Sequence, residues 1–232
     1  MKKITVLSGA GISAESGIQT FRDADGLWEG HEITEVASPE GFHRNPEMVL
    51  NFYNLRRRQL LTVAPNKAHQ LLADLEQLYH LDIITQNVDD LHERAGSSNV
   101  VHLHGELLKA RSSKNYDYIV DWHEDINLNS LCPNGHLMRP HIVWFGEAVP
   151  EFEQAIKRIE QANIVIIIGT SMQVYPAASL VKYAHKAGEI YYIDPTPGQI
   201  YHTVTPVKLI TEKATVGMQK LYDILMRGPQ KN

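Results

Sequence analysis

Short apolar runs rich in β-branched residues alternate along the chain with longer stretches of helical periodicity. Such runs, bounded by glycine or polar residues, predict buried strands. Strands are expected at residues 4–7, 82–85, 100–103, 163–168, 189–193 and 207–210. Helices are expected at residues 12–16, 46–61, 65–79, 151–161, 176–187 and 214–226. The alternation predicts an α/β fold, with a doubly wound, mostly parallel, Rossmann-like sheet covered by helices on both faces.

Two regions break this rhythm and predict a smaller lobe inserted beside the sheet. Residues 23–63 contain the long amphipathic helix, and no strand is expected there. Residues 109–140 are polar and loop-like. We therefore expect a single unit over residues 1–232. Its Rossmann-like part would come from about 1–22, 80–108 and 141–232, and its small lobe from about 23–79 and 109–140.

Composition narrows the classes of protein to which the chain can belong. The net charge of −5 argues against a general nucleic-acid binder, which needs a basic field. No apolar run approaches the ~18 residues of a membrane helix, and no signal peptide is recognised, so a cytoplasmic location without membrane contact is expected. The single cysteine, Cys132, excludes an internal disulfide and a four-thiolate zinc cluster. The sequence leaves the oligomeric state open.

A glycine turn follows the first predicted strand. Gly9-Ala10-Gly11 lets a backbone pass close to a ligand, and the helix expected after it offers free amide hydrogens to a phosphate. Taken alone, the turn is equally consistent with a simple tight turn. A hydride-transfer dehydrogenase would carry an acidic residue about 20 positions further on, at the end of a second strand. No such residue stands there, so a nucleotide would be held in a different pose.

Four motifs in order then identify a family resemblance. The glycine turn continues through Ser13 to Phe21-Arg22, and Thr85-Gln86-Asn87-Val88-Asp89-Asp90-Leu91-His92 follows the second strand. His104-Gly105 and Gly169-Thr170-Ser171 complete the set. This series resembles the sirtuin (Sir2-like) family of NAD-dependent protein-lysine deacylases, and it covers nearly the whole chain. The details are similar to the desuccinylase and demalonylase branch.

The resemblance implies NAD as the cofactor and assigns its contacts. The glycine turn would hold the phosphates, the residues after the second strand would hold the nicotinamide ribose and amide, and the fourth motif would contact the adenosine. The implied cofactor-binding residues are Gly9, Ala10, Gly11, Ser13, Phe21, Arg22, Trp28, Gln86, Asn87, Asp89, Gly169, Thr170, Ser171, Val174, Asp194 and Ala214. Asp194 departs from the asparagine often found in the family. Judged by spacing alone, Asn87 and Asp89 are as well explained as a helix cap.

His104 is the expected general base, with Asn87 as its catalytic partner. Histidine titrates near neutrality, which suits proton abstraction. His102, on the same strand face, is the alternative, but the family pattern has the base immediately before the glycine. The implied reaction is acyl transfer, in which the acyl oxygen attacks the ribose carbon and nicotinamide leaves. His104 then helps to deprotonate a ribose hydroxyl, and the products are free lysine and O-acyl-ADP-ribose.

The implied partner is an acyl-lysine protein or peptide, laid as an added strand against residues 141–147. This stretch matches the family's substrate motif, and its expected contacts are Val143, Phe145, Gly146 and Glu147. Tyr53 and Arg56 lie three positions apart on the long helix and match the pair that favours succinyl- or malonyl-lysine. Arg56 can clasp a carboxylate and Tyr53 can add a hydrogen bond. The alternative is that Arg56, Arg57 and Arg58 form a solvated basic face.

The chain departs from the family at the structural zinc. Ser112 stands where the first of four cysteines is expected, and only Cys132 of the second pair remains, so we expect no metal and a lost zinc. A replacement site made of His123, Cys132, His136 and His141 is the alternative. The small lobe would instead pack through Trp122, Leu128, Leu131, Leu137 and Met138.

Two rival functions stay open within the same fold. NAD hydrolysis or ADP-ribosyl transfer would need neither the substrate motif nor the pair Tyr53 and Arg56, and both are present. A non-catalytic sensor of NAD or ADP-ribose would have no need of His104 or Asn87. Removal of succinyl, malonyl and possibly acetyl groups from lysine is therefore the leading hypothesis.

Overall fold

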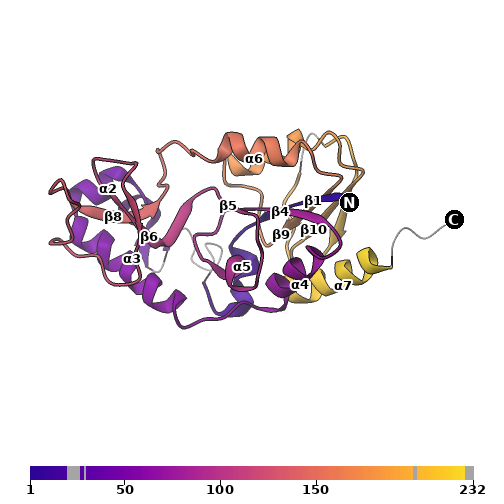
Figure 1. The fold of residues 1–232 in the computed structure, drawn as a ribbon, viewed down its shortest axis with the longest axis horizontal. Coiled ribbons are helices and arrows are strands. Elements are labelled where there is room, and N and C mark those ends of the chain that lie inside the picture. Colours follow the sequence, from indigo (N-terminus) through magenta and orange to yellow (C-terminus); the bar gives the residue numbers. More distant parts are fainter. Residues whose placement is uncertain (20–26, 29, 201–202, 228–232) are drawn as a thin grey trace.

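A six-stranded parallel sheet forms the larger part of the molecule (Figure 1). The structure is a computed structural model, and it describes residues 1–19, 27–28, 30–200 and 203–227. The strand order is β11-β10-β9-β1-β4-β5. In chain order these strands are β1 (Lys3–Ser8), β4 (His80–Thr85), β5 (Val100–His102), β9 (Ile164–Ile168), β10 (Glu189–Ile193) and β11 (Val207–Ile210). The predicted Rossmann-like sheet is therefore confirmed, with every predicted strand present.

Helices cover both faces of this sheet because its central strands are apolar on both sides. Every residue of β9 is buried, and its side chains alternate between two separate cores. One core packs against α4 (Lys67–Leu75) and α7 (Ala214–Met226), and the other against α6 (Phe152–Ile159) and the 3₁₀ helix η4 (Ala177–Tyr183). Figure 1 shows α6 on the opposite side of the sheet from α4 and α7. This is the two-sided covering that a parallel sheet requires.

The smaller lobe contains its own antiparallel sheet, which the sequence analysis missed. Its strands are β6 (Gly105–Ser112), β7 (Ile119–Asp121) and β8 (Met138–Ile142), in the order β7-β6-β8. The expectation of a loop over residues 109–140 was wrong in this respect. The strands were hidden because β8 carries Arg139, Pro140 and His141, which do not read as an apolar strand.

Helices and a short hairpin complete this lobe. The helices are α1 (Ile33–Val36), α2 (Pro39–Arg44) and α3 (Pro46–Leu60), and they pack beside the small sheet (Figure 1). The strands β2 (Leu27–Trp28) and β3 (His31–Glu32) pair with each other, so the expectation of no strand in residues 23–63 was also wrong. Two-residue strands are too short to give a periodic signal.

The helix expected at residues 12–16 is replaced by two 3₁₀ turns, η1 (Ala10–Ile12) and η2 (Ala14–Ser16). Their amides bond three residues back, as in Ser13 N to Ala10 O at 3.1 Å and Gly17 N to Ala14 O at 3.0 Å. Gly17, with φ of +96°, ends the segment before an α-helical bond can form. The short helix α5 (Leu91–Arg94) follows β4.

The strand order makes the carboxyl end of β1 the topological switch point of the sheet, and this region is called the crevice below. β4 lies on one side of β1 and β9 on the other, so the segments that leave these three strands diverge at their carboxyl ends. Ligands bind at such switch points in open α/β sheets. Among the described residues, no helix is long and apolar enough to cross a membrane.

Candidate active site

The turn after β1 and the turn after β9 interlock at this crevice. Gly9 N donates to Ile168 O at 3.1 Å, and Gly11 N donates to Gly169 O at 2.8 Å. A Cβ on Gly11 would stand 2.7 Å from Gly169 Cα, and one on Gly169 would stand 2.2 Å from Ile12 N. Gly169 also has a φ of +62°, which disfavours other residues. The glycines of two motifs 158 positions apart are therefore required by the same close contact.

Ser13 is the centre of a buried hydrogen-bond network beside this turn. Its hydroxyl accepts from Asn87 Nδ2 at 3.1 Å and donates to Asp89 Oδ2 at 2.9 Å. All three side chains are less than a tenth exposed. Burial raises the pKa of Asp89 to about 6, although hydrogen bonds from Leu91 N and from Ser13 oppose the rise. The structure thus brings three of the predicted cofactor-binding residues into one contact.

Two buried histidines beneath Ser13 were missed by the sequence analysis. Asn66 N donates to His69 Nδ1 at 3.3 Å, which leaves the ring proton on Nε2, 3.5 Å from Ser13 Oγ. His92 Nε2 lies 2.9 Å from Ser8 Oγ, and the two rings meet edge to face at 5.0 Å. Burial lowers the pKa of His69 to about 4 and that of His92 well below its usual value. Both rings are therefore neutral supports for the polar network.

His104 is the last residue of the two-residue turn between β5 and β6, and one of its ring nitrogens is engaged. Its Nδ1 lies 3.0 Å from the backbone oxygen of Gln86. Because a carbonyl oxygen only accepts, Nδ1 carries the proton and Nε2 holds the lone pair. Burial lowers the pKa of His104, opposed by this hydrogen bond. The result is a neutral, partly exposed imidazole that can accept a proton at Nε2.

His102, the alternative base, has both ring nitrogens engaged. Nδ1 lies 3.0 Å from Asn87 O and Nε2 lies 2.8 Å from Glu93 Oε1. Burial lowers the pKa of His102, but the bond and charge of Glu93 outweigh it and the net shift is upward. His102 therefore braces the segment that carries Asn87.

The other residues that were predicted to bind the cofactor lie mostly around the carboxyl ends of β4, β9 and β10. Gln86 Nε2 donates to Thr170 Oγ1 at 3.0 Å, which joins the second motif to the fourth. Asp194 is 1% exposed, and its Oδ1 accepts from Thr196 N at 2.9 Å. Ala214 begins α7 and is buried. On the loop after β9, Val174 is 38% exposed and Ser171 is partly exposed. Phe21 and Arg22 lie outside the described residues, and Trp28 is described only as part of β2.

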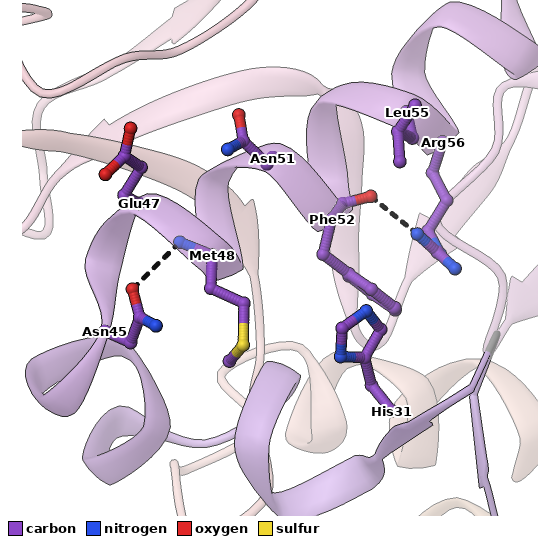
Figure 2. Close-up of a pocket in the computed structure, with 8 residues that line it drawn as sticks. All are labelled: His31, Asn45, Glu47, Met48, Asn51, Phe52, Leu55 and Arg56. Atoms are coloured by element: carbon purple, nitrogen blue, oxygen red, sulfur yellow. Dashed lines mark hydrogen bonds between the residues drawn. The ribbon is translucent and has the colours of Figure 1, made fainter.

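Tyr53 and Arg56 lie on α3 and line one small cavity of about 60 Å³. The cavity is also lined by Ile18, Gln19, Leu60, Val88, Asp89 and Leu107, so it reaches the polar network of the crevice. Tyr53 is fully buried, and burial raises the pKa of its hydroxyl. Arg56 also lines a larger cavity of about 500 Å³ on the outer side of α3 (Figure 2). Its guanidinium donates to Phe52 O at 2.6 Å and lies 3.2 Å from the centre of the Phe52 ring.

The stretch after β8 is held from below by a buried ion cluster. Glu147 accepts from Arg111 at 2.9 Å and from Arg139 at 2.7 and 3.1 Å, and its Oε2 also accepts from Trp144 N at 2.8 Å. Val143 N donates to His104 O, which ties this stretch to the turn that carries His104. Glu147 therefore faces the protein interior.

The outer residues of this stretch are free to meet a ligand. Phe145 is 50% exposed, and Val143 is partly exposed. Gly146 has a φ of +89° and makes the turn that returns Glu147 to its arginines. Val143, Phe145 and Gly146 thus form one accessible edge beside the crevice.

Comparison with known proteins decides the family. The Sir2 family model matches residues 9–176, which include the glycine turn, the network around Ser13 and His104. The chain belongs to the Sir2 family. A relative from Helicobacter pylori, named NAD-dependent protein deacylase, is 60% identical over 221 residues, covering 95% of this chain and 96% of the relative. One from Bacteroides thetaiotaomicron with the same name is 50% identical, covering 99% and 100%. A solved complex of a Sir2 homologue with NAD has a TM-score of 0.87 and 40% identity, covering 97% and 90%.

The turns at Ser112 and Cys132, where the loss of zinc is predicted, contain hydrogen bonds of their own. Ser112 Oγ accepts from the amides of Lys114 at 3.3 Å and Asn115 at 3.2 Å. Cys132 N donates to His136 O at 2.8 Å, and a hydrogen bond with Ser112 lowers the pKa of the Cys132 thiol. In the part of the chain that the structure describes, no three His, Cys, Asp or Glu side chains converge to hold a metal ion.

The core of the small Sir2 lobe differs from the one expected. Met138 is buried as predicted, and it packs with Leu50, Ala110, Ile126 and Cys132. Leu128 and Leu131 are 47% and 55% exposed, so their assignment to the core was wrong. They lie between Ile126 and the turn at Cys132, in a segment outside the named strands that meets the start of β8 through Met138 N to Ser130 O at 2.7 Å and an isolated bridge of Leu131 with Leu137.

Proposed function

We propose that this Sir2-family chain is a NAD-dependent protein-lysine deacylase that prefers succinyl and malonyl groups. One observation carries the proposal. The neutral imidazole of His104 and the hydrogen-bond network of Ser13, Asn87 and Asp89 both lie beyond the carboxyl ends of the parallel strands. The names of the relatives support the general reaction. The cavity between Tyr53 and Arg56 supports the choice of acyl group.

The residues of the crevice fit NAD by their chemistry. The side chains of Ser13, Asn87, Asp89 and Gln86 offer donors and acceptors for a ribose and a carboxamide. Bound NAD would supply an electrophilic ribose carbon and nicotinamide as its leaving group. Ser13, Asn87 and Asp89 are preorganised by their mutual bonds, so little ordering is needed on binding.

His104 would act as the base that takes a proton from a ribose hydroxyl. The bond from Nδ1 to Gln86 O fixes the tautomer, so Nε2 is the accepting atom. Its lowered pKa keeps the ring unprotonated at neutral pH, and the activity should therefore be lost only on the acid side, below about pH 6.5. The products would be free lysine and O-acyl-ADP-ribose.

The substrate would lie along the edge formed by Val143, Phe145 and Gly146, with its acyl-lysine directed into the cavity near Asp89. A succinyl or malonyl group ends in a carboxylate. Arg56 would pair with that carboxylate, and Tyr53 would donate a hydrogen bond to it. An acetyl group has no such oxygen, so it would lose these two contacts.

We also propose that the enzyme works without zinc. The turns at Ser112 and Cys132 are closed by hydrogen bonds of their own, and Cys132 packs into the core of the lobe. The lobe is therefore held by packing, and Ser112 stands at the opposite end of β6 from His104, so the loss of zinc would leave the chemistry intact.

The test is the turnover of one peptide carrying succinyl-, malonyl- or acetyl-lysine, followed by mass spectrometry with and without NAD. NAD-dependent loss of the succinyl group in preference to the acetyl group, with O-succinyl-ADP-ribose as co-product, is expected. Nicotinamide release without deacylated peptide would instead indicate a NAD hydrolase or ADP-ribosyltransferase. NAD binding without any nicotinamide release would indicate a sensor.

A further inference from the structure

A single hydrogen bond joins the stretch after β8 to the helix that carries the acyl-binding pair. Trp144 Nε1 donates to the hydroxyl oxygen of Tyr53 at 3.0 Å, across 91 positions of sequence. Both side chains are buried, at 2% and 0% exposure. The bond therefore forms inside the protein, where it competes little with water.

The chemistry of the two groups fixes the direction of this bond. An indole N–H can only donate, so the Tyr53 oxygen must be the acceptor. The phenol hydrogen is then turned away from the indole. Burial raises the pKa of Tyr53, so the hydroxyl keeps that hydrogen. Tyr53 is thus set as a donor, and it lines the cavity that it shares with Arg56.

Trp144 is itself held so that its indole cannot turn away. The Arg139 guanidinium carbon lies 3.2 Å from the centre of the Trp144 ring, and Phe42 packs against the ring at 5.2 Å. The Trp144 backbone amide donates to Glu147, which is in turn bound by Arg139. The position of the indole N–H is therefore determined by four separate contacts, counting the bond to Tyr53.

We propose that Trp144 is a specificity-determining residue that acts through Tyr53. The indole N–H bonds to a lone pair of the Tyr53 oxygen, so the Tyr53 hydrogen must point elsewhere. In this way Trp144 orients that hydrogen toward the distal carboxylate of a succinyl- or malonyl-lysine. The inference rests on the proposed function and deepens it. An acetyl group carries no distal oxygen, so Trp144 contributes to selectivity and not to the handling of lysine as such.

The test measures binding without turnover. Isothermal titration with succinyl-lysine and acetyl-lysine forms of one peptide, in the absence of NAD, gives a ratio of dissociation constants for each variant. Trp144→Phe removes the N–H and keeps an aromatic ring over Arg139. We expect the preference for succinyl to fall about fivefold, the effect of one lost hydrogen bond. The ratio of kcat/KM values should fall in parallel.

A double-mutant cycle separates action through Tyr53 from a general effect. In a Tyr53→Phe background, Trp144→Phe should change the ratio no further. Equal weakening of both peptides by Trp144→Phe, or losses that multiply in the double variant, would overturn the proposal. If Trp144→Phe does not fold, benzothienylalanine at position 144 keeps the shape of the indole without its N–H and should lower the ratio in the same way.

The wild-type ratio distinguishes failure of this inference from failure of the proposed function. A wild-type protein without a preference for succinyl contradicts both proposals. A wild-type preference that survives Trp144→Phe contradicts only the role of Trp144.

Discussion

One hydrogen bond determines the chemistry that His104 can perform. The bond from Nδ1 to Gln86 O assigns the ring proton, and the same loop begins β6 at Gly105. Gly105 has a φ of +80°, and a Cβ there would stand 2.0 Å from His141 O. The glycine that follows His104 is therefore needed for the backbone to turn, and the His104 ring is partly exposed beside it.

Replacing His104 with alanine should abolish deacylation without preventing cofactor binding. Loss of a general base costs about 10²–10⁴-fold in rate. The dissociation constant of ADP-ribose, measured by titration, should change by less than about threefold, because His104 is not expected to hold the cofactor. A tenfold change would correspond to ~1.4 kcal/mol. His43→Ala, an exposed position on α2, is the control and should keep full turnover. Turnover by His104→Ala close to wild type would remove His104 from the mechanism.

Buried neutral histidines should make the protein less stable in mild acid. The folded-state pKa of His69 is about 4 and that of His92 is also depressed, so both bind fewer protons folded than unfolded. Their contribution is present above about pH 6.5 and is lost as pH falls. Asp89, whose pKa is raised to about 6, and His102, whose pKa is also raised, act in the opposite sense, but the lowered pKa values of His104 and His141 add to the loss. The net free energy of unfolding should therefore fall as the pH is lowered from about 6.5 to about 5.

Urea unfolding across this pH range checks the sign. His69→Gln removes one titrating ring while glutamine can keep the capping contact at Asn66. The variant should lose less stability on acidification than the wild type, and His43→Gln should behave as the wild type. A midpoint that does not move with pH, or an unchanged slope in His69→Gln, would contradict the assignment.

At the scale of elements, α3 gives three consecutive arginines three different environments. Arg57 is fully buried, and its Nε donates to Leu107 O at 3.1 Å, which docks the helix on β6. Arg58 is 60% exposed and lies 3.3 Å from Asp125. Arg56 is partly buried and lines the cavities on both sides of the helix. The alternative of a solvated basic face therefore applies to Arg58 alone.

Arg56→Met should reduce the preference for succinyl-lysine by about tenfold or more. A hydrogen-bonded contact to a charged group is worth about 1.5–3 kcal/mol, and methionine keeps most of the volume. The measurement is the ratio of kcat/KM for succinyl over acetyl peptides. Arg58→Met, the same change two positions along the helix, is the matched control and should leave the ratio unaltered. Equal losses on both peptides would mean that Arg56 supports the fold and not the acyl pocket.

At the scale of the whole molecule, apolar packing joins the Rossmann-like part to the small lobe. Among the described residues, Leu91 of α5 belongs to the same buried cluster as Leu107 of β6 and Trp144 after β8, and this cluster also contains residues of α3. A small lobe fixed in this way has support other than a metal ion.

Chelation should therefore leave the protein folded. Treatment with a strong zinc chelator should change the melting temperature by less than about 1 °C. For a protein of this size, 1 kcal/mol of stability corresponds to ~2–4 °C, so the expected loss of stability is a fraction of 1 kcal/mol. Metal analysis should find well under one zinc per chain. A Sir2 relative with all four cysteines is the control and should lose stability. A large drop in melting temperature here would point to the replacement site around His123 and Cys132.

Much of the fold was predictable because a parallel sheet buries its strands on both faces. Runs such as 164–168 are apolar without interruption, and this pattern is independent of the partners that cover them. The family motifs were equally visible, since glycine turns and the residues after strands are local in sequence. The six strands could thus be read from the chain alone, and the residues of the NAD side stay a prediction made from the motifs.

The small lobe and the supports of the site depended on contacts between distant residues. His69 reaches Ser13 across 56 positions, and Trp144 reaches Tyr53 across 91. A histidine or tryptophan has no local pattern that reveals its partner. The sequence by itself determined the sheet, the family and the candidate base, because these depend on local apolar runs and motifs. Only the tertiary structure decided which histidines are buried, which arginine docks α3 and which oxygen Trp144 holds, because each requires two segments to meet in space.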